Sequence, residues 1–236
     1  MRIMTFNVQH FRDYKNDRID FDLFADFIRE QNVDFCGLNE IRGDGPLKDY
    51  TDQTSTLADK LGFERYFGEA IKVKGSSPYG NAVICAKNIK SAETVKIPDP
   101  VFKFPWASYE SRCIIRATAE LDGAEIMLLV CHMGLVKSEK RNAVKEICRI
   151  LDSSTLPCIL MGDFNTTPEK PVLEPIRKRM KDADMLAEAK GYPTYPSDKP
   201  VEKLDYIFYR GLECTYCEAI KRVVSDHLPI IAEFKI

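Results

Sequence analysis

The sequence lacks any run of the roughly 18 apolar residues that a membrane-spanning helix needs. Its start, MRIMTFNV, also lacks the basic region and apolar stretch of a signal peptide. The sequence also has no large excess of charge of one sign, because it contains 34 Lys and Arg and 36 Asp and Glu. The resulting net charge of −2 gives no overall attraction to a polyanion, although it leaves room for a local basic patch. We therefore expect a soluble, cytoplasmic protein.

Paired metal-binding motifs are nearly absent. The one CTYC, Cys214 to Cys217, has no second Cys/His pair to complete a zinc site, and most of the eight cysteines stand in apolar runs such as NAVICA and LLVCH. We expect buried thiols in a reducing compartment. No GxxxxGK loop occurs, which excludes P-loop nucleotide triphosphatases. With 236 residues and 44% hydrophobic content, the chain suits one domain over residues 1–236.

The hydrophobic pattern predicts a layered α/β protein with mixed sheets. A strand, a helix and a second strand open the chain, and a second helix follows. CIIRATAEL and EIMLLVCH read as a hairpin that turns at Asp122-Gly123. Ser138 is the predicted N-cap of the next helix, and CILMG, LDYIFY and PIIAEFKI are predicted strands. The polar motifs stand where predicted strands end, which is where layered α/β folds gather ligands and catalytic groups.

The strongest motif is MGDFNTTP, which directly follows an apolar run. It places Asp163 and Asn165 at the end of a predicted strand. Residues i and i+2 of an extended segment share a face, so both side chains can address one substrate atom. The carboxylate can hold or deprotonate a water, and the amide can donate to a phosphate oxygen. Taken alone, an Asp/Asn turn that caps the next helix explains the motif equally well.

Two later motifs combine acidic residues with histidine. In VSDHLPI, Asp226 and His227 precede the last predicted strand and suit a metal carboxylate and a phosphate-facing imidazole, with a surface turn as the alternative. In KLDYIFY, Asp205 enters an apolar strand, which is costly unless the carboxylate is paired. We expect His227 to be its partner, and backbone hydrogen bonds are the alternative.

Asn7, Glu40 and His132 also end predicted strands, in TFNVQ, LNEI and EIMLLVCH. Two parallel strands that end side by side would bring Asn7 and Glu40 together as oxygen ligands for Mg²⁺ or Mn²⁺. For a lone Glu a solvated loop is the usual explanation. Two of the three histidines fall beside other motifs, which favours a functional His132 over a packed one. We expect His10 to be structural or superficial, at the rim of the site.

Taken in order, TFN, LNE, YGNAV, ESR, CHM, GDFN, LDYIF and SDHLP resemble the motif set of the endonuclease/exonuclease/phosphatase superfamily, whose fold is like that of deoxyribonuclease I. The resemblance runs from Asn7 to Pro229. Each motif is short and weak, but eight in order at strand ends form a specific signal. The resemblance implies a four-layer α/β/β/α sandwich, in which two packed mixed β-sheets are flanked by helices.

The resemblance also implies roles for individual residues. Glu40 would be the principal metal ligand, with Asn7 beside it and Asp226 near the metal. Asn81 of YGNAV and Arg112 of ESR match positions that line the cleft, and we expect them to bind substrate. The expected metal is Mg²⁺, with Mn²⁺ possible.

Five residues match the family's catalytic positions. Asp163 would position or activate the attacking water, and Asn165 would contact the phosphate. His132 and His227 would donate to phosphate oxygens as charge develops, and Asp205 would orient His227. Such a site hydrolyses a phosphate mono- or diester without a covalent intermediate.

Substrate choice in such folds is made by loops. Gln9 and His132 stand where abasic-site endonucleases have other residues, so the chain looks more like the bacterial metal-dependent hydrolases of the superfamily, although Cys131 replaces their Thr. The loop PDPVFKFPWASY, residues 98–109, carries aromatics near Lys103. They can form a wall that stacks a ring, touch a lipid surface, or fix the loop to the core. The basic run RKRMK, residues 177–181, suits a solvated helix end.

Three hypotheses follow for a protein that we expect to be a monomer acting on a phosphate-ester substrate. The first is a hydrolase of a small or medium phosphate ester. The second is a DNA or RNA nuclease of the same fold, which predicts a basic strip flanking the cleft. The third is a catalytically inactive binding module, which the presence of Glu40, Asp163, Asp205 and His227 disfavours.

Overall fold

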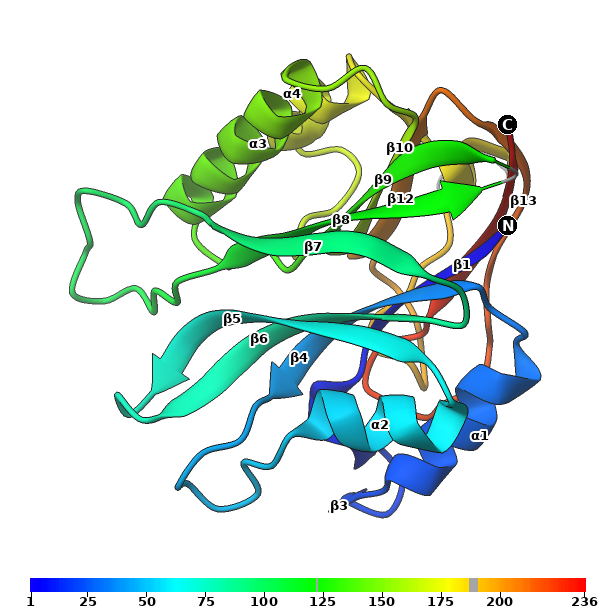
Figure 1. The fold of residues 1–236 in the computed structure, drawn as a ribbon. Coiled ribbons are helices and arrows are strands. Elements are labelled where there is room, and N and C mark those ends of the chain that lie inside the picture. Colours follow the sequence, from blue (N-terminus) through cyan, green and yellow to red (C-terminus); the bar gives the residue numbers. More distant parts are fainter. Residues whose placement is uncertain (122, 187–190) are drawn as a thin grey trace.

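Two six-stranded β-sheets pack face to face, and helices cover the outer face of each (Figure 1). The computed structural model describes residues 1–121, 123–186 and 191–236. Helices α1 (Phe21–Glu30) and α2 (Gln53–Leu61) cover one sheet, and α3 (Lys137–Asp152) and the short α4 (Glu174–Arg177) cover the other. The predicted four-layer α/β/β/α sandwich is therefore confirmed. Within the described ranges, no helix has both the length and the apolar character needed to cross a bilayer.

Both sheets are mixed, with a polar or short strand at most edges. The first sheet has the strand order β13 (Glu213–Ala219), β14 (Ile230–Lys235), β1 (Arg2–Asn7), β4 (Phe35–Arg42), β6 (Ser77–Cys85) and β5 (Glu64–Val73). The second has the order β11 (Lys181–Asp182), β12 (Asp205–Arg210), β10 (Cys158–Asp163), β9 (Ala124–Cys131), β8 (Cys113–Leu121) and β7 (Ile89–Lys96). The remaining described elements are a two-stranded ribbon and three short 3₁₀ helices. The ribbon consists of β2 (Arg12–Asp13) and β3 (Arg18–Ile19), and the 3₁₀ helices are η1 (Gln9–Phe11), η2 (Pro171–Leu173) and η3 (Ala183–Leu186).

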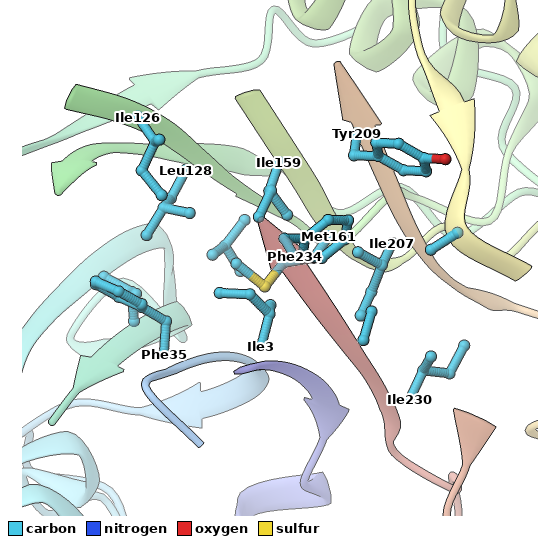
Figure 2. Close-up of a cluster of buried hydrophobic side chains, with 14 of the residues drawn as sticks. Ile3, Phe35, Ile126, Leu128, Ile159, Met161, Ile207, Tyr209, Ile230 and Phe234 are labelled. Atoms are coloured by element: carbon cyan, nitrogen blue, oxygen red, sulfur yellow. The ribbon is translucent and has the colours of Figure 1, made fainter. Parts of the chain in front are cut away.

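Three apolar layers hold the sandwich together. The central layer lies between the sheets, where Ile3 and Phe35 of the first sheet face Leu128 and Met161 of the second (Figure 2). One outer layer packs the first sheet against α1 and α2, and the other packs the second sheet against α3 and α4. Burial of this apolar surface at roughly 25 cal/mol per Å² is the main force that fixes the sheets on each other.

All eight cysteines are buried and none forms a disulfide. Cys214 and Cys217 lie on β13 and contribute to the central apolar layer. Burial raises the pKa of both thiols, which opposes the thiolate form that a zinc site requires. The structure therefore supports the packing interpretation of the CTYC motif.

Most predicted elements are present, with two differences. The helix predicted to follow Ser138 begins at Lys137, and the backbone N–H of Val136 donates to the Glu139 carboxylate (3.1 Å), so the prediction of Ser138 as N-cap is wrong. The strands β5, β7 and β13 were not predicted. The hairpin of β8 and β9 is confirmed, while Asp122 of its predicted turn lies outside the described residues.

The topology brings strand ends from both sheets to one edge. β1 and β4 run parallel with Asn7 opposite Asn39. In the second sheet β9 and β10 are parallel, and Asp163 at the end of β10 lies opposite Asp205 at the start of β12. Gly162 allows the end of β10 to lie close to Cys131 at the end of β9, because it has φ +141° and a Cβ atom there would lie 1.8 Å from the carbonyl oxygen of Cys131.

Candidate active site

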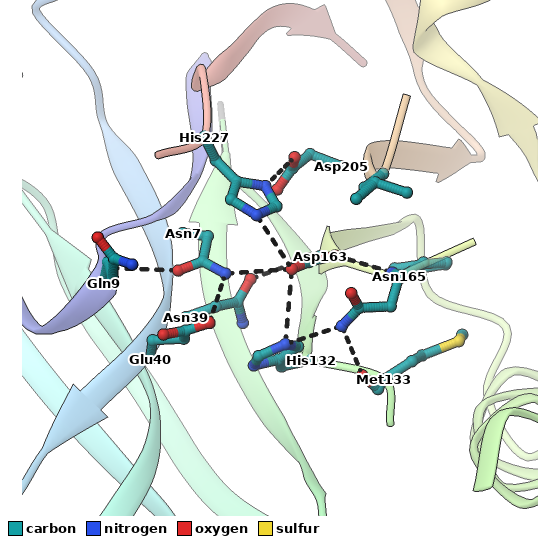
Figure 3. A network of polar contacts seen from close by, with 12 residues as sticks. Asn7, Gln9, Asn39, Glu40, His132, Met133, Asp163, Asn165, Asp205 and His227 are labelled. Carbon is teal, nitrogen blue, oxygen red and sulfur yellow. Dashed lines mark hydrogen bonds and ion pairs between the residues drawn. The ribbon is translucent and has the colours of Figure 1, made fainter. Parts of the chain in front are cut away.

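Asp163 lies at the centre of a polar network that joins both sheets (Figure 3). Its side chain accepts hydrogen bonds from the backbone N–H of Asn165 (2.8 Å) and from the Asn7 amide (3.1 Å). The Nε2 atoms of His132 and His227 lie 3.5 and 3.8 Å from its Oδ2. The residue is 1% exposed, and burial raises its pKa to about 7, although the charge of His227 opposes the shift. A carboxylate with this pKa can accept a proton from water near neutral pH.

His227 and Asp205 form a buried ion pair beside Asp163. The Nδ1 atom of His227 donates to Oδ2 of Asp205 at 2.8 Å, and Asp205 is fully buried. Burial alone lowers the pKa of His227, but the charges of Asp205, Asp163 and Asp226 more than offset it and raise this pKa to about 10. The imidazolium therefore presents a charged Nε2–H toward Asp163. Tyr195 packs against the same ring, with ring centroids 4.9 Å apart.

His132 is held in the opposite charge state. Nη1 of Arg112 lies 3.1 Å from its Nδ1, and a guanidinium can only donate. Nδ1 must therefore accept, and the proton of the neutral ring sits on Nε2, toward Asp163. Burial, followed by the charge of Arg112, holds the pKa of His132 well below its usual value. The Asn165 amide nitrogen, 3.1 Å from Nε2, donates instead to the carbonyl of Met133 at 3.0 Å.

Glu40 stands at a β-bulge, one residue past the end of the ladder between β1 and β4. The register between β4 and β6 shifts between Asn39 and Ile41, and Glu40 has φ +64°. Non-glycine residues rarely adopt this conformation, and such strain clusters at functional sites. The bulge turns the Glu40 carboxylate toward the cleft, where its Oε1 accepts from the Asn7 amide at 3.0 Å.

Asn7 bridges the two central carboxylates. Its amide nitrogen donates to both Glu40 and Asp163, while its Oδ1 accepts from the backbone N–H of Gln9 at 3.2 Å. The nitrogen of the amide thus faces the carboxylates, and Asn7 would have to rotate its amide to offer oxygen to a metal.

Asn81 lies behind the cleft and not on its wall. It is buried, and its Oδ1 accepts from the Asn39 amide at 2.9 Å, while its own amide donates to the carbonyl of Cys113 at 3.2 Å. The Oδ1 of Asn39 in turn accepts from the backbone N–H of Asp163 at 2.9 Å. Asn81 therefore supports the backbone that carries Asp163. In this geometry Asn81 does not line the cleft, where we expected it to contact substrate. Asn39, which sequence reasoning missed, lies between Asn81 and Asp163.

The network forms the floor of a cleft of about 920 Å³. Glu40, Arg112, His132, Asp163, Asn165, Asp226 and His227 all line it. Sequence reasoning missed several other lining residues, among them Tyr79, Lys137, Lys140 and Tyr195. Lys140 had no recognisable signal, because its position depends on the helix that begins just after His132. The cleft thus combines acidic groups with cationic and neutral donors.

The oxygen groups at the Glu40 side of the cleft fit a divalent cation. Burial, and to a lesser extent the charge of Glu40, raises the pKa of the Asp226 carboxyl, so these carboxylates repel each other unless a cation lies between them. Carboxylate and amide oxygens are the ligands that Mg²⁺ prefers. Asp163, Asp205 and His227 also lie within 4.8 Å of one another. A cation there would have to displace the hydrogen bond between His227 and Asp205, so the Glu40 side suits a metal better.

The sequence profile of the endonuclease/exonuclease/phosphatase family matches residues 4–227. A UPF0294 protein of Vibrio vulnificus (strain YJ016) is 29% identical over 118 residues, which are 46% of this chain and 39% of that protein, so the chain matches well under half the length of this relative. An endonuclease/exonuclease/phosphatase family protein from Leptotrichia buccalis has a similar structure, with a TM-score of 0.81, 24% identity and full coverage of both chains. The mannosyl-6-phosphatase of Bacteroides thetaiotaomicron has a TM-score of 0.79 and 14% identity, again with full coverage of both chains. These likenesses show a shared fold.

Proposed function

The chain belongs to the endonuclease/exonuclease/phosphatase family, whose members hydrolyse phosphate esters, and we propose that it is a metal-dependent phosphoesterase that attacks a phosphate mono- or diester with an activated water. The observation that carries the proposal is the position of Asp163. Its buried carboxylate, with a pKa raised to about 7, lies between two imidazole Nε2 atoms at the floor of the cleft.

The proposed chemistry divides between the two sides of the cleft. Asp163 holds the attacking water and takes its proton. His227 offers a charged donor and His132 a neutral one to the oxygens of the phosphate, where negative charge develops in the transition state. The side-chain amide of Asn165 adds a polar group beside His132. Asp205 keeps His227 charged and oriented, and Arg112 keeps the proton of His132 on Nε2.

The metal site of the proposal consists of Glu40 and Asp226, with Asn7 as an additional oxygen ligand if its amide rotates. A bound Mg²⁺ or Mn²⁺ would neutralise charge on the phosphate and lower the pKa of a coordinated water. Glu40 is the only one of these residues whose backbone is strained, which supports its assignment as the principal ligand.

A nuclease is the second candidate, and a row of cations that begins at the mouth of the cleft supports it. Lys137, at the mouth of the cleft, is followed along α3 by Arg141 and Lys145, all exposed. A strand of nucleic acid in the cleft could follow these cations.

The test is hydrolysis of bis-p-nitrophenyl phosphate, p-nitrophenyl phosphate and a plasmid, each with Mg²⁺, with Mn²⁺ and with chelator. Metal-dependent cleavage of the small esters supports the phosphoesterase, and plasmid nicking at low salt favours the nuclease. Glu40→Gln should weaken Mg²⁺ binding at least about tenfold by calorimetry, whereas the exposed Glu213→Gln should not. Unchanged metal binding by Glu40→Gln would contradict the proposed ligand assignment.

A further inference from the structure

The loop between β7 and β8 presents a cluster of apolar side chains to solvent. Val101 is 91% exposed, Phe102 83%, Phe104 55% and Trp106 81%. We call these four residues the apolar tip. Figure 1 shows the loop projecting beyond the rest of the fold, beside the end of α3. Isolated exposed apolar residues are ordinary, but a contiguous group at a projecting tip marks an interaction surface.

The apolar tip is supported by the loop itself. Phe104 and Trp106 stack with their ring centroids 4.9 Å apart. The backbone N–H of Phe104 donates to the Tyr109 hydroxyl at 3.1 Å, and Lys103 pairs with Asp99 at 2.8 Å. Lys103, which stands between the tip residues in the sequence, is therefore paired inside the loop, and the apolar tip itself carries no charge.

The exposed rings serve neither the core nor the cleft. Their exposure shows that they do not fix the loop to the core, which the sequence had left as one explanation. None of the four tip residues lines the cleft as the structure describes it, whereas Glu110 and Arg112 at the base of the loop do. A platform that stacks the ring of a bound substrate would have to face the cleft. Of the three explanations of this loop, contact with a lipid surface is the one that the geometry favours.

The helix to which the loop is attached carries a row of exposed cations. The Asn142 amide donates to the carbonyl of Pro98 (2.8 Å), which attaches the loop to α3. Lys137, Arg141 and Lys145 lie four residues apart on that helix, hence about 6 Å apart along its axis. All three are exposed, and within the described part of the chain none has a carboxylate within 4.0 Å. They line a groove of about 630 Å³ that shares Lys137 with the catalytic cleft.

We propose that the apolar tip and the cations of α3 dock the protein on the surface of an anionic phospholipid membrane. Trp and Phe side chains favour the boundary between headgroups and acyl chains, and lysine and arginine beside them attract anionic headgroups. A nucleic acid would account for the cations but not for the exposure of Val101 and Phe102. Docking would hold the mouth of the cleft, where Leu135 is 65% exposed, close to the membrane.

Trp106 is the only tryptophan in the chain, so its fluorescence reports directly on the tip. The protein is mixed with vesicles of phosphatidylcholine alone and with vesicles of equal parts phosphatidylcholine and phosphatidylserine. We expect the emission to shift to shorter wavelength, and the protein to sediment with the vesicles, when phosphatidylserine is present. High salt should weaken this binding, because the lysine and arginine contribution is screened.

Two pairs of variants separate the apolar and charged contributions. Val101→Ser with Phe102→Ser should weaken vesicle binding about tenfold or more, whereas Val201→Ser, at an apolar residue exposed elsewhere, should not. Arg141→Glu with Lys145→Glu should remove the preference for phosphatidylserine, whereas Lys221→Glu with Lys235→Glu, the same charge change elsewhere, should retain it. Circular dichroism confirms that each variant is folded.

Three results would overturn the proposal. The first is an emission spectrum that vesicles leave unchanged. The second is a shift that appears without lipid and grows with protein concentration, which would assign the tip to contact between two copies of the chain. The third is equal binding of the Val101/Phe102 variant, with a single-stranded oligonucleotide displacing the protein from vesicles, which would assign the cations to nucleic acid. None of these three measurements requires turnover, so their outcomes are independent of the proposed hydrolysis.

Discussion

Replacing Asp163 with Asn should stabilise the metal-free protein at neutral pH while strongly lowering turnover. Burial raises the pKa of Asp163 from its ordinary value of 3.8 to about 7. The folded chain thus holds this proton more tightly than the unfolded chain, and folding becomes less favourable as pH rises from about 4 to about 7. Above pH 7 both states are ionised and the cost is constant. Asn carries no charge, so the variant avoids this cost.

The size of the effect follows from this shift. The difference between about 7 and 3.8 corresponds to a few kcal/mol, at about 1.4 kcal/mol for each pKa unit. This difference already includes the hydrogen bonds that the carboxylate accepts from Asn165 and from Asn7, because both oppose the rise in pKa. Asn, like the protonated carboxyl, offers one carbonyl oxygen to these donors. The variant should therefore be more stable than the wild type by about a few kcal/mol at pH 8 and about as stable as the wild type at pH 4.

Urea unfolding in the presence of chelator, at intervals from pH 4 to pH 8, measures this difference. The control is Asp44→Asn, at an exposed carboxylate that stays in water in both states. Turnover of the Asp163 variant with metal should fall by a factor on the order of 10² to 10⁴. A variant that is less stable at pH 8, or a difference that does not grow between pH 4 and pH 7, would refute the argument from burial. Retained turnover would refute the assignment of Asp163 as the base.

Two further substitutions test how the histidines are held. Arg112→Met should lower kcat about ten- to a hundredfold with a smaller effect on KM, because His132 loses the donor that keeps its proton on Nε2; a pH profile identical to that of the wild type would argue against this role. Asp205→Asn and His227→Ala should each lower kcat, and the double variant should be no slower than His227→Ala alone, because Asp205 acts through His227. Additive losses in kcat would show that Asp205 has a separate function.

The buried strands were predictable from sequence and the edge strands were not. β1, β9 and β10 have nearly continuous apolar runs, because both faces of each strand are covered in a four-layer sandwich. The missed strands β5 and β7 lie at sheet edges, carry alternating charged residues such as those of IKSAETVK, and are largely exposed on one face. Charged edges of this kind prevent pairing with other chains, and the same charges hide the strands from a search for apolar runs.

Most residues at the floor of the cleft were predictable, but their supports were not. The ordered motifs identified Glu40 and Asp163, which stand where an apolar run ends, and His227, which stands just before one begins. Asn39 lies in the middle of LNEI and gives no such signal, although its side chain accepts from the Asp163 backbone. The bulge at Glu40 also gives no signal in the sequence, because one extra residue in a strand leaves the local composition unchanged.

The two histidines beside the Asp163 carboxylate thus differ in charge. His227 is kept protonated by the Asp205 carboxylate at 2.8 Å, whereas His132 is kept neutral by burial and by the Arg112 guanidinium at 3.1 Å. Two imidazolium rings so close to each other would repel, and two neutral rings would leave Asp163 without a charged imidazole beside it. The arrangement gives two Nε2–H donors of different charge, both aimed at the same place, and it requires only that the partner on each Nδ1 differ. Because the two partners come from distant segments, the residue just before β8 and the first residue of β12, this division of charge is a property of the fold that no single motif contains.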